Sequence, residues 1–318
     1  MLTTCASRPR PRGLANRKLH KLAKTLARRR KVYRAELAKL ECLVASRLAL
    51  GERPFKTKAE ARLYIGGLSS PSKMPCESWS IPAEFCHRGG QLARIPGTVC
   101  FGCYAFGNFY AMPDTIIAML RRFERISAPL WIEAFVKILE NQDYFRWFDS
   151  GDIQSIAMFE AIVEIARRCP NCYFWVPSKE YTGGPMGGGI IGEYIAKHGR
   201  DSIPANLVIR LSAFRVDQRP PEAIASRLGL VTSTVHSGPE FSCPASRQNN
   251  FCLDCRNCWK SEIPNIGYHK HGPDKAPRGG VNIKTLMAWL ETRLSRNLKS
   301  DRRHATQWAE TLEAIKRN

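Results

Sequence analysis

The amino-acid sequence predicts an α/β protein with a TIM-barrel-like core or a partial parallel barrel, a cysteine-rich metal-binding insertion and basic helical termini. Three observations support this prediction. Strand-like and helix-like segments alternate through the middle of the chain, cysteines gather in two regions, and basic residues concentrate near the ends. Such alternation is typical of βαβ units with right-handed crossovers, in which the strands pair in parallel.

The charge balance indicates an acidic partner. The chain has 318 residues, with 49 Lys and Arg against 28 Asp and Glu, which gives a formal net charge of +21. Such a field favours nucleic acid, an anionic membrane surface or an acidic protein. No apolar run is long enough to span a membrane, and no signal peptide is readable. We therefore expect a cytoplasmic protein (in the host cell, if phage-encoded) that binds DNA or RNA and no membrane.

The N-terminal segment predicts a basic amphipathic helix. Residues 1–34 contain no Asp or Glu, and the Pro-Arg alternation of residues 8–12 is typical of extended chain. From Leu14 to about Leu50, apolar residues recur near helical spacing, and the helix should end at Gly51 with residues 28–31 exposed. That face either is merely solvated or contacts nucleic acid; a mitochondrial transit peptide is a further alternative. The apolar positions are Leu19, Leu22, Leu26, Val32 and Leu37.

The rest of the chain divides by pattern. Residues 64–113 are rich in Gly, Pro, Ser, Cys and aromatics and predict an irregular region that bound metal would order. We expect an N-terminal extension over 1–60, an α/β core domain over 61–275 and a helical segment over 276–318. The predicted strands are 144–148, 173–176, 207–211 and 231–235; the predicted helices are 156–168, 190–198, 221–228 and 281–318.

Polar residues at the predicted strand ends form the candidate active site. In parallel α/β folds, reactive groups lie where strands end and loops begin. We expect Asp149 and Asp152 to act as base or base-recognition carboxylates, Lys179 and Arg210 to hold phosphate, and His236 to transfer protons. Alternatively, the Asp and Ser residues merely cap the following helices. The neighbouring residues expected to contact a cofactor are Ser150, Gly151 and Ser178.

The downstream cysteines indicate a metal centre. Cys243 precedes a Cys-x2-Cys-x2-Cys run, with His269 and His271 shortly after it. Four soft thiolate ligands suit tetrahedral zinc or an iron–sulfur cluster, and the choice between them stays open. The ligands of this predicted centre are Cys243, Cys252, Cys255 and Cys258.

An upstream group of Cys76, Cys86, Cys100 and Cys103 predicts a second zinc site. The segment Cys100-x2-Cys103-Tyr-Ala105 also resembles the end of the cysteine motif of radical S-adenosylmethionine enzymes. That motif has a third cysteine where this chain has Pro96, so Cys76 or Cys86 would have to serve instead.

Two further motifs have structural and functional alternatives. The Gly-rich run of residues 183–189 precedes a predicted helix and is either a flexible loop or a phosphate cradle, with the loop favoured. Cys169 and Cys172 flank a helix–strand turn and form either a buried pair, which we favour, or a redox-active one.

Two family resemblances follow from these motifs. Asp149-Ser-Gly-Asp-Ile-Gln154 resembles a segment of tRNA-guanine transglycosylases, which implies a base-handling role for Asp149 and a zinc cluster downstream. Several stretches together resemble the "gene product 88" proteins of bacteriophages over about residues 64–272, a resemblance that implies a phage context. They are residues 72–75, 79–83, 97–105, 145–152 and 243–259.

Three functional hypotheses result. The first is a metal-containing enzyme that modifies a nucleobase or nucleotide. The second is a non-catalytic, zinc-stabilised nucleic-acid-binding protein. The third is a radical S-adenosylmethionine-like enzyme with an unusual cluster.

Overall fold

The computed structural model describes residues 12–183 and 188–270, of which 12–23 and 108 are described as backbone only. Six strands form one sheet in which every pairing is parallel and the strand order follows the chain. The predicted α/β class with a parallel sheet is therefore confirmed, and a closed barrel stays a prediction. The strands are β1 (Ser78–Trp79), β2 (Tyr144–Trp147), β3 (Tyr173–Ser178), β4 (Leu207–Ser212), β5 (Val231–His236) and β6 (Asn265–His269).

Eight α-helices accompany this sheet within the described ranges. The predicted helices of the central region are confirmed within a residue or two, whereas β1 and β6 were not predicted. β1 lies in the region expected to be irregular and has only two residues, too few to show alternation. The helices are α1 (Arg12–Ala49), α2 (Lys58–Tyr64), α3 (His87–Leu92), α4 (Pro113–Glu124), α5 (Trp131–Leu139), α6 (Ile156–Arg168), α7 (Gly189–His198) and α8 (Glu222–Leu228).

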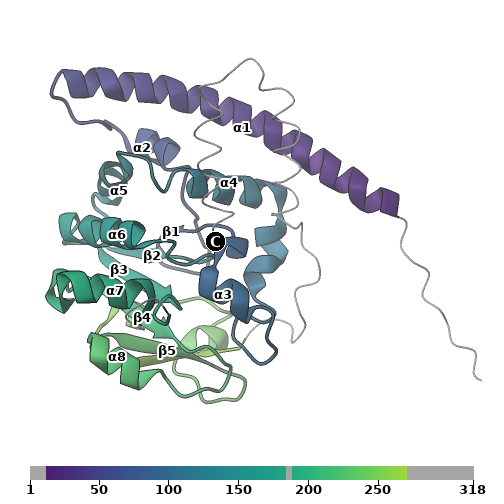
Figure 1. Ribbon diagram of the computed structural model, residues 1–318, viewed down its shortest axis with the longest axis vertical. Helices are drawn as coiled ribbons and strands as arrows, with labels where there is room; N and C mark the ends of the chain where they lie inside the picture. The colour runs from purple at the N-terminus through teal and green to yellow at the C-terminus, as the bar shows by residue number, and fades with distance from the viewer. Residues whose placement is uncertain (1–11, 184–187, 271–318) are drawn as a thin grey trace, which may run out of the picture.

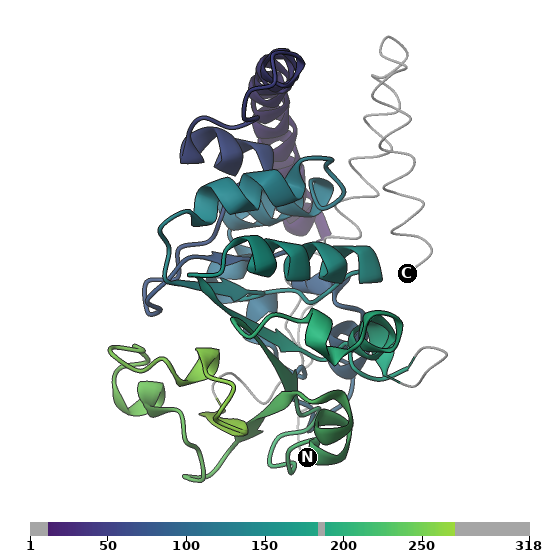
Figure 2. The same ribbon diagram turned by 90° about the vertical axis from the view of Figure 1, so that its left-hand side faces the viewer.

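The helices α5 to α8 stack on one side of the sheet (Figure 1). A sequential strand order makes each βαβ crossover advance in the same direction, so right-handed crossovers leave their helices on one face. The connection from β5 to β6 differs, because it contains no α-helix and its turn at Asn257–Trp259 packs against β3 and β4. Figure 2 shows this light-green segment on the side away from α6 and α7. The sheet therefore has a helix face and an opposite face, which we call the open face.

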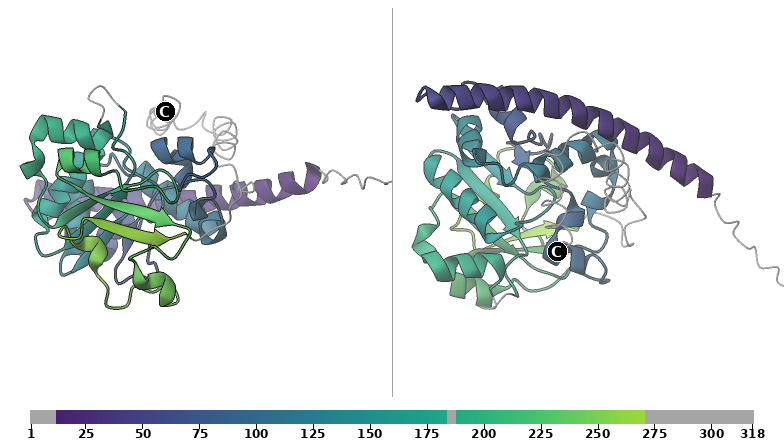
Figure 3. Two further views of the ribbon diagram at one scale, coloured as in Figure 1. Left: turned by 90° about the horizontal axis from the view of Figure 1, so that it is seen from below. Right: turned by 45° about the horizontal axis from the view of Figure 1, so that its top comes forward.

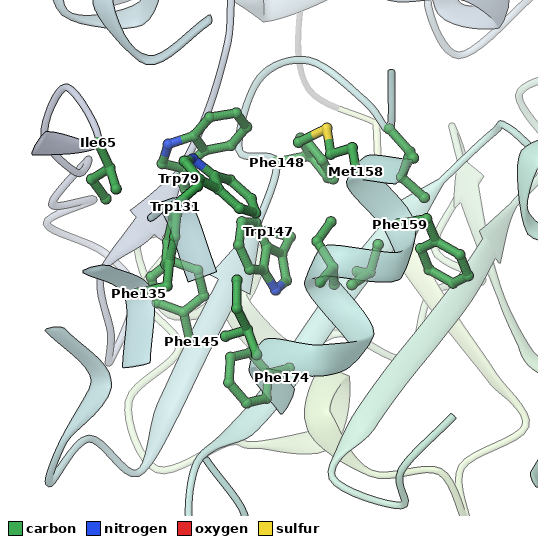
Figure 4. Packing of buried hydrophobic residues seen from close by; sticks show 14 of the residues in the cluster. Ile65, Trp79, Trp131, Phe135, Phe145, Trp147, Phe148, Met158, Phe159 and Phe174 are labelled. Atoms are coloured by element: carbon green, nitrogen blue, oxygen red, sulfur yellow. The ribbon is translucent and has the colours of Figure 1, made fainter. Parts of the chain in front are cut away.

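The alternation of side chains along β2 and β3 defines the two faces. Phe145 and Trp147 point to the helix face, where the centroid of Trp147 lies 4.9 Å from that of Phe135 in α5. Arg146, between them, lies on the open face with its guanidinium carbon 4.5 Å from the ring centroid of Trp175. Figure 4 shows the aromatic core of the helix face, in which Trp79 and Trp147 are fully buried. Burying such large rings provides much of the driving force for folding.

α1 runs along the end of the body formed by α2 and α4 and extends beyond it (Figure 3). Its buried positions follow the i, i+3, i+4 spacing of an amphipathic helix, and it packs against α4 and α2. The predicted bounds of this helix are confirmed. The predicted face is partly wrong, because Val32 is 55% exposed while Tyr33 is buried. Arg30 is likewise not exposed, since it pairs with Glu124 at 2.9 Å. The buried positions are Leu26, Tyr33, Leu37, Leu40, Val44 and Arg47.

Some predictions fall on residues outside the described ranges. The extended segment of residues 8–12 lies there apart from Arg12, which begins α1. The C-terminal helix over 281–318, the segment 276–318 and His271 lie there as well, as does the middle of the Gly-rich run.

Candidate functional site

The carboxyl edge of the sheet gathers most of the predicted site residues. All strands run in parallel, so the residues that follow β2 and β3 emerge at the same edge. Asp149 and Asp152 follow β2, and Lys179 follows β3. The long connection after β1 adds Cys86, Cys100 and Cys103 to this edge, as the contacts below show.

Asp149 is buried and accepts hydrogen bonds from three hydroxyl groups, two on its carboxylate and one on its backbone carbonyl. Ser78 Oγ donates to Asp149 Oδ1 at 2.8 Å, and Tyr110 Oη donates to Oδ2 at 2.8 Å. Tyr104 Oη donates to the backbone carbonyl of Asp149 at 2.6 Å. Burial raises the pKa of both tyrosines, so they stay protonated donors. The carboxylate therefore fastens the segment of residues 104–110 to the end of β2.

Asp152 links the ends of β2 and β3. Its Oδ1 accepts hydrogen bonds from Ser178 Oγ at 2.7 Å and from its neighbour Ile153 N at 2.8 Å. Its Oδ2 accepts from Lys179 N at 2.9 Å. Burial raises the pKa of this carboxyl even so. The alternative that Asp152 caps α6 is wrong, because Ser155 Oγ accepts the hydrogen bond from Met158 N at 3.1 Å.

The turn between these carboxylates has a steric basis. Gly151 has a φ of +91°, and a Cβ at this position would lie 2.2 Å from Cγ1 of Ile81. The carbonyl of Ser150 accepts from Ile81 N at 3.1 Å, while its buried Oγ has no hydrogen-bond partner among the described residues. Ser178 Oγ also accepts from Glu180 N at 3.0 Å. The contacts of Ser150, Gly151 and Ser178 therefore organise the edge itself; cofactor contact stays a prediction.

Three cysteines of the β1–β2 connection lie together beside Asp152. The sulfurs of Cys86 and Cys100 lie 3.6 and 3.5 Å from the position that a Cβ would take on Gly89. Burial raises the pKa of Cys103 to about 11, and the neighbouring Cys100 thiol adds to the shift. Burial also raises the pKa of Cys86, whose electrostatic neighbours include Cys100 and Cys103. We call Cys86, Cys100 and Cys103 the upstream thiol group.

Cys76 does not belong to this group. Its electrostatic neighbours are Arg146, Cys252 and Arg256, so it lies with the downstream cysteines. The prediction of one upstream site on four cysteines is therefore wrong for Cys76. The reason is topological, since Cys76 precedes β1 and Cys86 follows it, which places them beyond opposite ends of that strand.

Glu180 is a site residue that the sequence interpretation did not select. Its Oε1 accepts a hydrogen bond from Arg88 N at 2.9 Å, next to Cys86. Burial and the nearby charge of Asp152 raise its pKa to about 7. Burial raises the pKa of Cys100 and Cys103, and the positive charge of Lys179 offsets part of this effect. Glu180 could have been suspected because it belongs to the polar run that begins at Ser178.

Arg210 performs a structural task instead of holding phosphate. Arg210 lies on the open face, at a place where the β5–β6 connection packs against the sheet, and it is fully buried there. Its five guanidinium hydrogens all donate to backbone carbonyls. Four of the five carbonyls belong to residues 257–263, at distances of 2.7 to 3.1 Å. The predicted phosphate role is therefore wrong: no donor is left for a ligand.

His236 lies at the end of β5, two strands away from Lys179 in the sheet. Its Nε2 lies 2.8 Å from Thr234 Oγ1, and its Nδ1 lies 4.0 Å from Asp217 Oδ1. These partners differ from those of Asp149 and Asp152. A shared cleft for Asp149, Lys179 and His236 stays a prediction.

The downstream cysteines lie across the open face. Cys258 Sγ lies 3.2 Å from Tyr268 Oη in β6. Cys243 is an electrostatic neighbour of both Cys252 and Cys258. Nevertheless, no three His, Cys, Asp or Glu side chains in the described ranges are already spaced to hold a metal ion. Metal binding at either cysteine group therefore requires the sulfurs to move together.

The Cys169/Cys172 pair and the Gly-rich run both make contacts that stabilise the fold. Cys169 and Cys172 are buried and unbonded to each other, and Asn206 Nδ2 donates to both their carbonyls at 3.0 and 2.8 Å. The favoured buried pair is confirmed. In the Gly-rich run, Gly189 N donates to Gly183 O at 2.8 Å, which closes the loop at its base.

These features define a class: an α/β protein with an all-parallel sheet in chain order, cysteines at its carboxyl edge and a cysteine-rich crossover on its open face. The family model for gene product 88 matches residues 43–261. The chain therefore belongs to the gene product 88 family, which confirms the resemblance seen in the sequence. No curated protein matches it, and no solved structure does. Among the described residues, no helix is both long and apolar enough to cross a membrane.

Proposed function

We propose that the protein is an iron–sulfur enzyme of the radical S-adenosylmethionine type that acts on nucleic acid. The observation that carries the proposal is the upstream thiol group at the carboxyl edge of a sequential parallel sheet. The resemblance of the Cys100–Ala105 segment to the radical enzyme motif left one ligand missing at Pro96. Cys86 meets that need, because its sulfur and that of Cys100 flank the same position beside Gly89.

The donor set fits an iron–sulfur cluster. Three soft thiolates would hold three irons of a [4Fe–4S] cluster and leave one iron open to a small molecule. Gly89 leaves space beside two of the sulfurs, where a Cβ would lie 3.1 Å from the Cβ of Cys86. When bound, the cluster supplies one-electron chemistry to S-adenosylmethionine.

The residues around the thiols prepare the site. Burial raises the pKa of Cys100 and Cys103, and the positive charge of Lys179 offsets part of that effect. Asp149, through Tyr104 and Tyr110, holds the loop that follows Cys103 against β2. Glu180 Oε1 orients the first turn of α3 through Arg88 N, directly after Cys86. These contacts fix both ends of the loop that carries the three thiols.

The first test is the iron content of the full chain. Anaerobically reconstituted wild-type protein should be brown, with about four iron and four sulfide bound at this group. Cys86→Ser, Cys100→Ser and Cys103→Ser should each lose most of that iron, since all three thiolates are ligands. Cys42→Ser is the matched control, because Cys42 is exposed on α1.

Metal analysis and visible absorption measure the outcome, and far-UV circular dichroism confirms that each variant is folded. A colourless wild-type protein after reconstitution would contradict the proposal. So would a Cys86→Ser variant that is folded and retains full iron.

The nucleic-acid part of the proposal is supported by the charge of +21 and by the outer face of α1. Lys24, Arg28, Lys31 and Lys39 are exposed there. Deleting residues 1–50 would be a poor test, because α1 buries Leu37 and Val44 in the core. Exchanging exposed charges leaves that packing in place.

Changing these four residues to glutamine should weaken nucleic-acid binding and flatten its salt dependence. Each lost phosphate contact lowers the log–log salt slope by about 0.9 on duplex DNA. Binding measured from 50 to 200 mM salt gives the slope. The control changes four exposed basic residues elsewhere, namely Arg94, Arg219, Arg227 and Lys260. An unchanged slope in the α1 variant, or an equal loss in the control, would show that α1 is not the binding face.

A further inference from the structure

The open face of the sheet brings together cysteines from segments far apart in the chain. Cys252 N donates to Lys73 O at 3.0 Å, which joins the β5–β6 crossover to the segment before β1. Cys76 lies in that segment, and Cys252 is one of its electrostatic neighbours. Cys243, Cys252 and Cys255 are mutual electrostatic neighbours. The hydrogen bonds from Cys252 N to Lys73 O and from Cys255 N to Cys252 O thus bring the crossover cysteines to the segment that contains Cys76.

Cys258 is also an electrostatic neighbour of Cys243, but its own contacts differ from those of these four cysteines. It lies in the turn that packs on β3 and β4, with its sulfur 3.2 Å from the hydroxyl of Tyr268. The adjacent Trp259 is buried, and its Nε1 donates to Phe145 O at 2.9 Å. Cys258 therefore belongs to the anchored end of the crossover.

The backbone around the thiols is fixed by hydrogen bonds and not by apolar packing. Arg210 binds the crossover at residues 257–263, and Cys243 N donates to Gly267 O at 2.9 Å. Between these anchors, Phe251 and Leu253 are 40% and 59% exposed. Leu253 has a φ of +43°, which strains a leucine backbone, whereas Asn249 and Asn250 have positive φ values that asparagine tolerates. Because so few side chains between these anchors are buried, an interaction other than apolar packing must stabilise the conformation of this segment.

Unused hydrogen-bond donors lie on the same face. Trp175 is 6% exposed, and its buried Nε1 has no partner among the described residues; Arg146 Nε is likewise unpaired. Arg146 is an electrostatic neighbour of Cys76, Cys252 and Cys258. A buried donor without an acceptor is costly, and a thiolate site supplies both acceptors and a compensating negative charge.

We infer that the open face holds a second metal centre, a zinc ion bound by Cys243, Cys252 and Cys255 with Cys76 as the fourth ligand. Four thiolates form the closed tetrahedral site of structural zinc, and the Cys252-x2-Cys255 spacing is typical of it. Arg146 acts as a positioning residue whose charge offsets the excess negative charge of four thiolates. Binding draws the crossover onto the segment before β1. This inference is independent of the iron–sulfur proposal, because the two thiol groups share no cysteine.

A cobalt titration tests the centre without interference from the upstream group. The parent protein for this test is the full chain carrying C86S, C100S and C103S. Apo protein should bind one equivalent of Co²⁺ with thiolate-to-metal charge-transfer absorption, and Zn²⁺ should displace it. Cys76→Ser and Cys252→Ser should each weaken Zn²⁺ binding at least tenfold, because a ligand is lost. Cys42→Ser and Cys258→Ser should bind as the parent does.

Arg146→Gln should weaken Zn²⁺ binding by about 10- to 100-fold with unchanged stoichiometry, as losses in the outer shell of metal sites do. A merely structural role for Arg146 would lower the melting temperature without changing that affinity. X-ray absorption of the zinc-loaded parent should give four sulfurs at about 2.3 Å. This measurement needs no further substitution in the parent, and fewer than four sulfurs would overturn the inference. Loss of the metal in Cys258→Ser with retention in Cys76→Ser would overturn the ligand assignment.

Discussion

Replacement of Arg210 by methionine should destabilise the protein by about 4 kcal/mol or more. Arg210 is fully buried, and its loss removes five hydrogen bonds at once. Each carbonyl left without a donor in the interior costs about 1 to 3 kcal/mol. Methionine fills part of the volume but donates nothing. The free energy of unfolding in urea measures the effect.

Because Arg210 anchors the crossover, limited proteolysis should cut the variant between β5 and β6 before the rest of the chain. Arg219→Met is the matched control, since Arg219 is exposed and should change stability by less than about 0.5 kcal/mol. Arg210→Lys should fall between the two, because an ammonium retains the charge but has three donors. If Arg210→Met unfolds at the same urea concentration as wild type, its hydrogen bonds do not hold the crossover.

Gly151→Ala should also lower stability strongly, by about 2 to 5 kcal/mol. The new Cβ would lie 2.2 Å from Cγ1 of Ile81, which is fully buried and has no room to retreat. Overpacking of this kind costs about 1 to 3 kcal/mol, and the φ of +91° adds the strain of a left-handed alanine. The same change displaces the backbone between Asp149 and Asp152, so iron binding by the reconstituted protein should fall with it.

Gly67→Ala separates these two costs. Gly67 has a similar φ of +95°, but a Cβ there meets no atom within 4 Å. Its loss should be about 1 kcal/mol, from backbone strain alone. Thermal and urea unfolding of the two variants side by side give the difference, which is the cost of the clash with Ile81. Equal losses in both variants would mean that the turn after β2 tolerates a side chain and that packing against Ile81 does not position the carboxylates.

The contacts of the carboxylates also bear on the nucleobase-modification hypothesis. Asp152 accepts three hydrogen bonds from the protein, and Asp149 accepts two on its carboxylate oxygens. A general base needs a lone pair within reach of the substrate proton. These carboxylates already serve as acceptors within the fold, whereas three neighbouring thiols have no disulfide partner. The thiols therefore give the stronger basis for chemistry at this edge.

The sequence by itself determined the alternation that builds the sheet. Strands such as Leu207–Ser212 combine β-branched and apolar residues, and helices such as Ile156–Arg168 repeat apolar residues on one side. These are local properties, so periodicity is enough to find them. The end of α1 near Gly51 and the burial of Cys169 and Cys172 followed in the same way. The sequence did not predict β1, because a strand of two residues is too short to show an alternating pattern.

Only the tertiary structure decided which side chains meet. Cys76 and Cys86 are near in sequence, yet β1 separates them, so one joins Cys252 and the other joins Cys100. The sequence alone suggests Arg210 as a phosphate ligand, but the crossover that follows β5 supplies four of the five carbonyls that its donors bind, and Thr232 of β5 supplies the fifth. Strand periodicity fixes the face on which a side chain lies. The partner that it meets there depends on chain segments distant in sequence, and no local pattern encodes them.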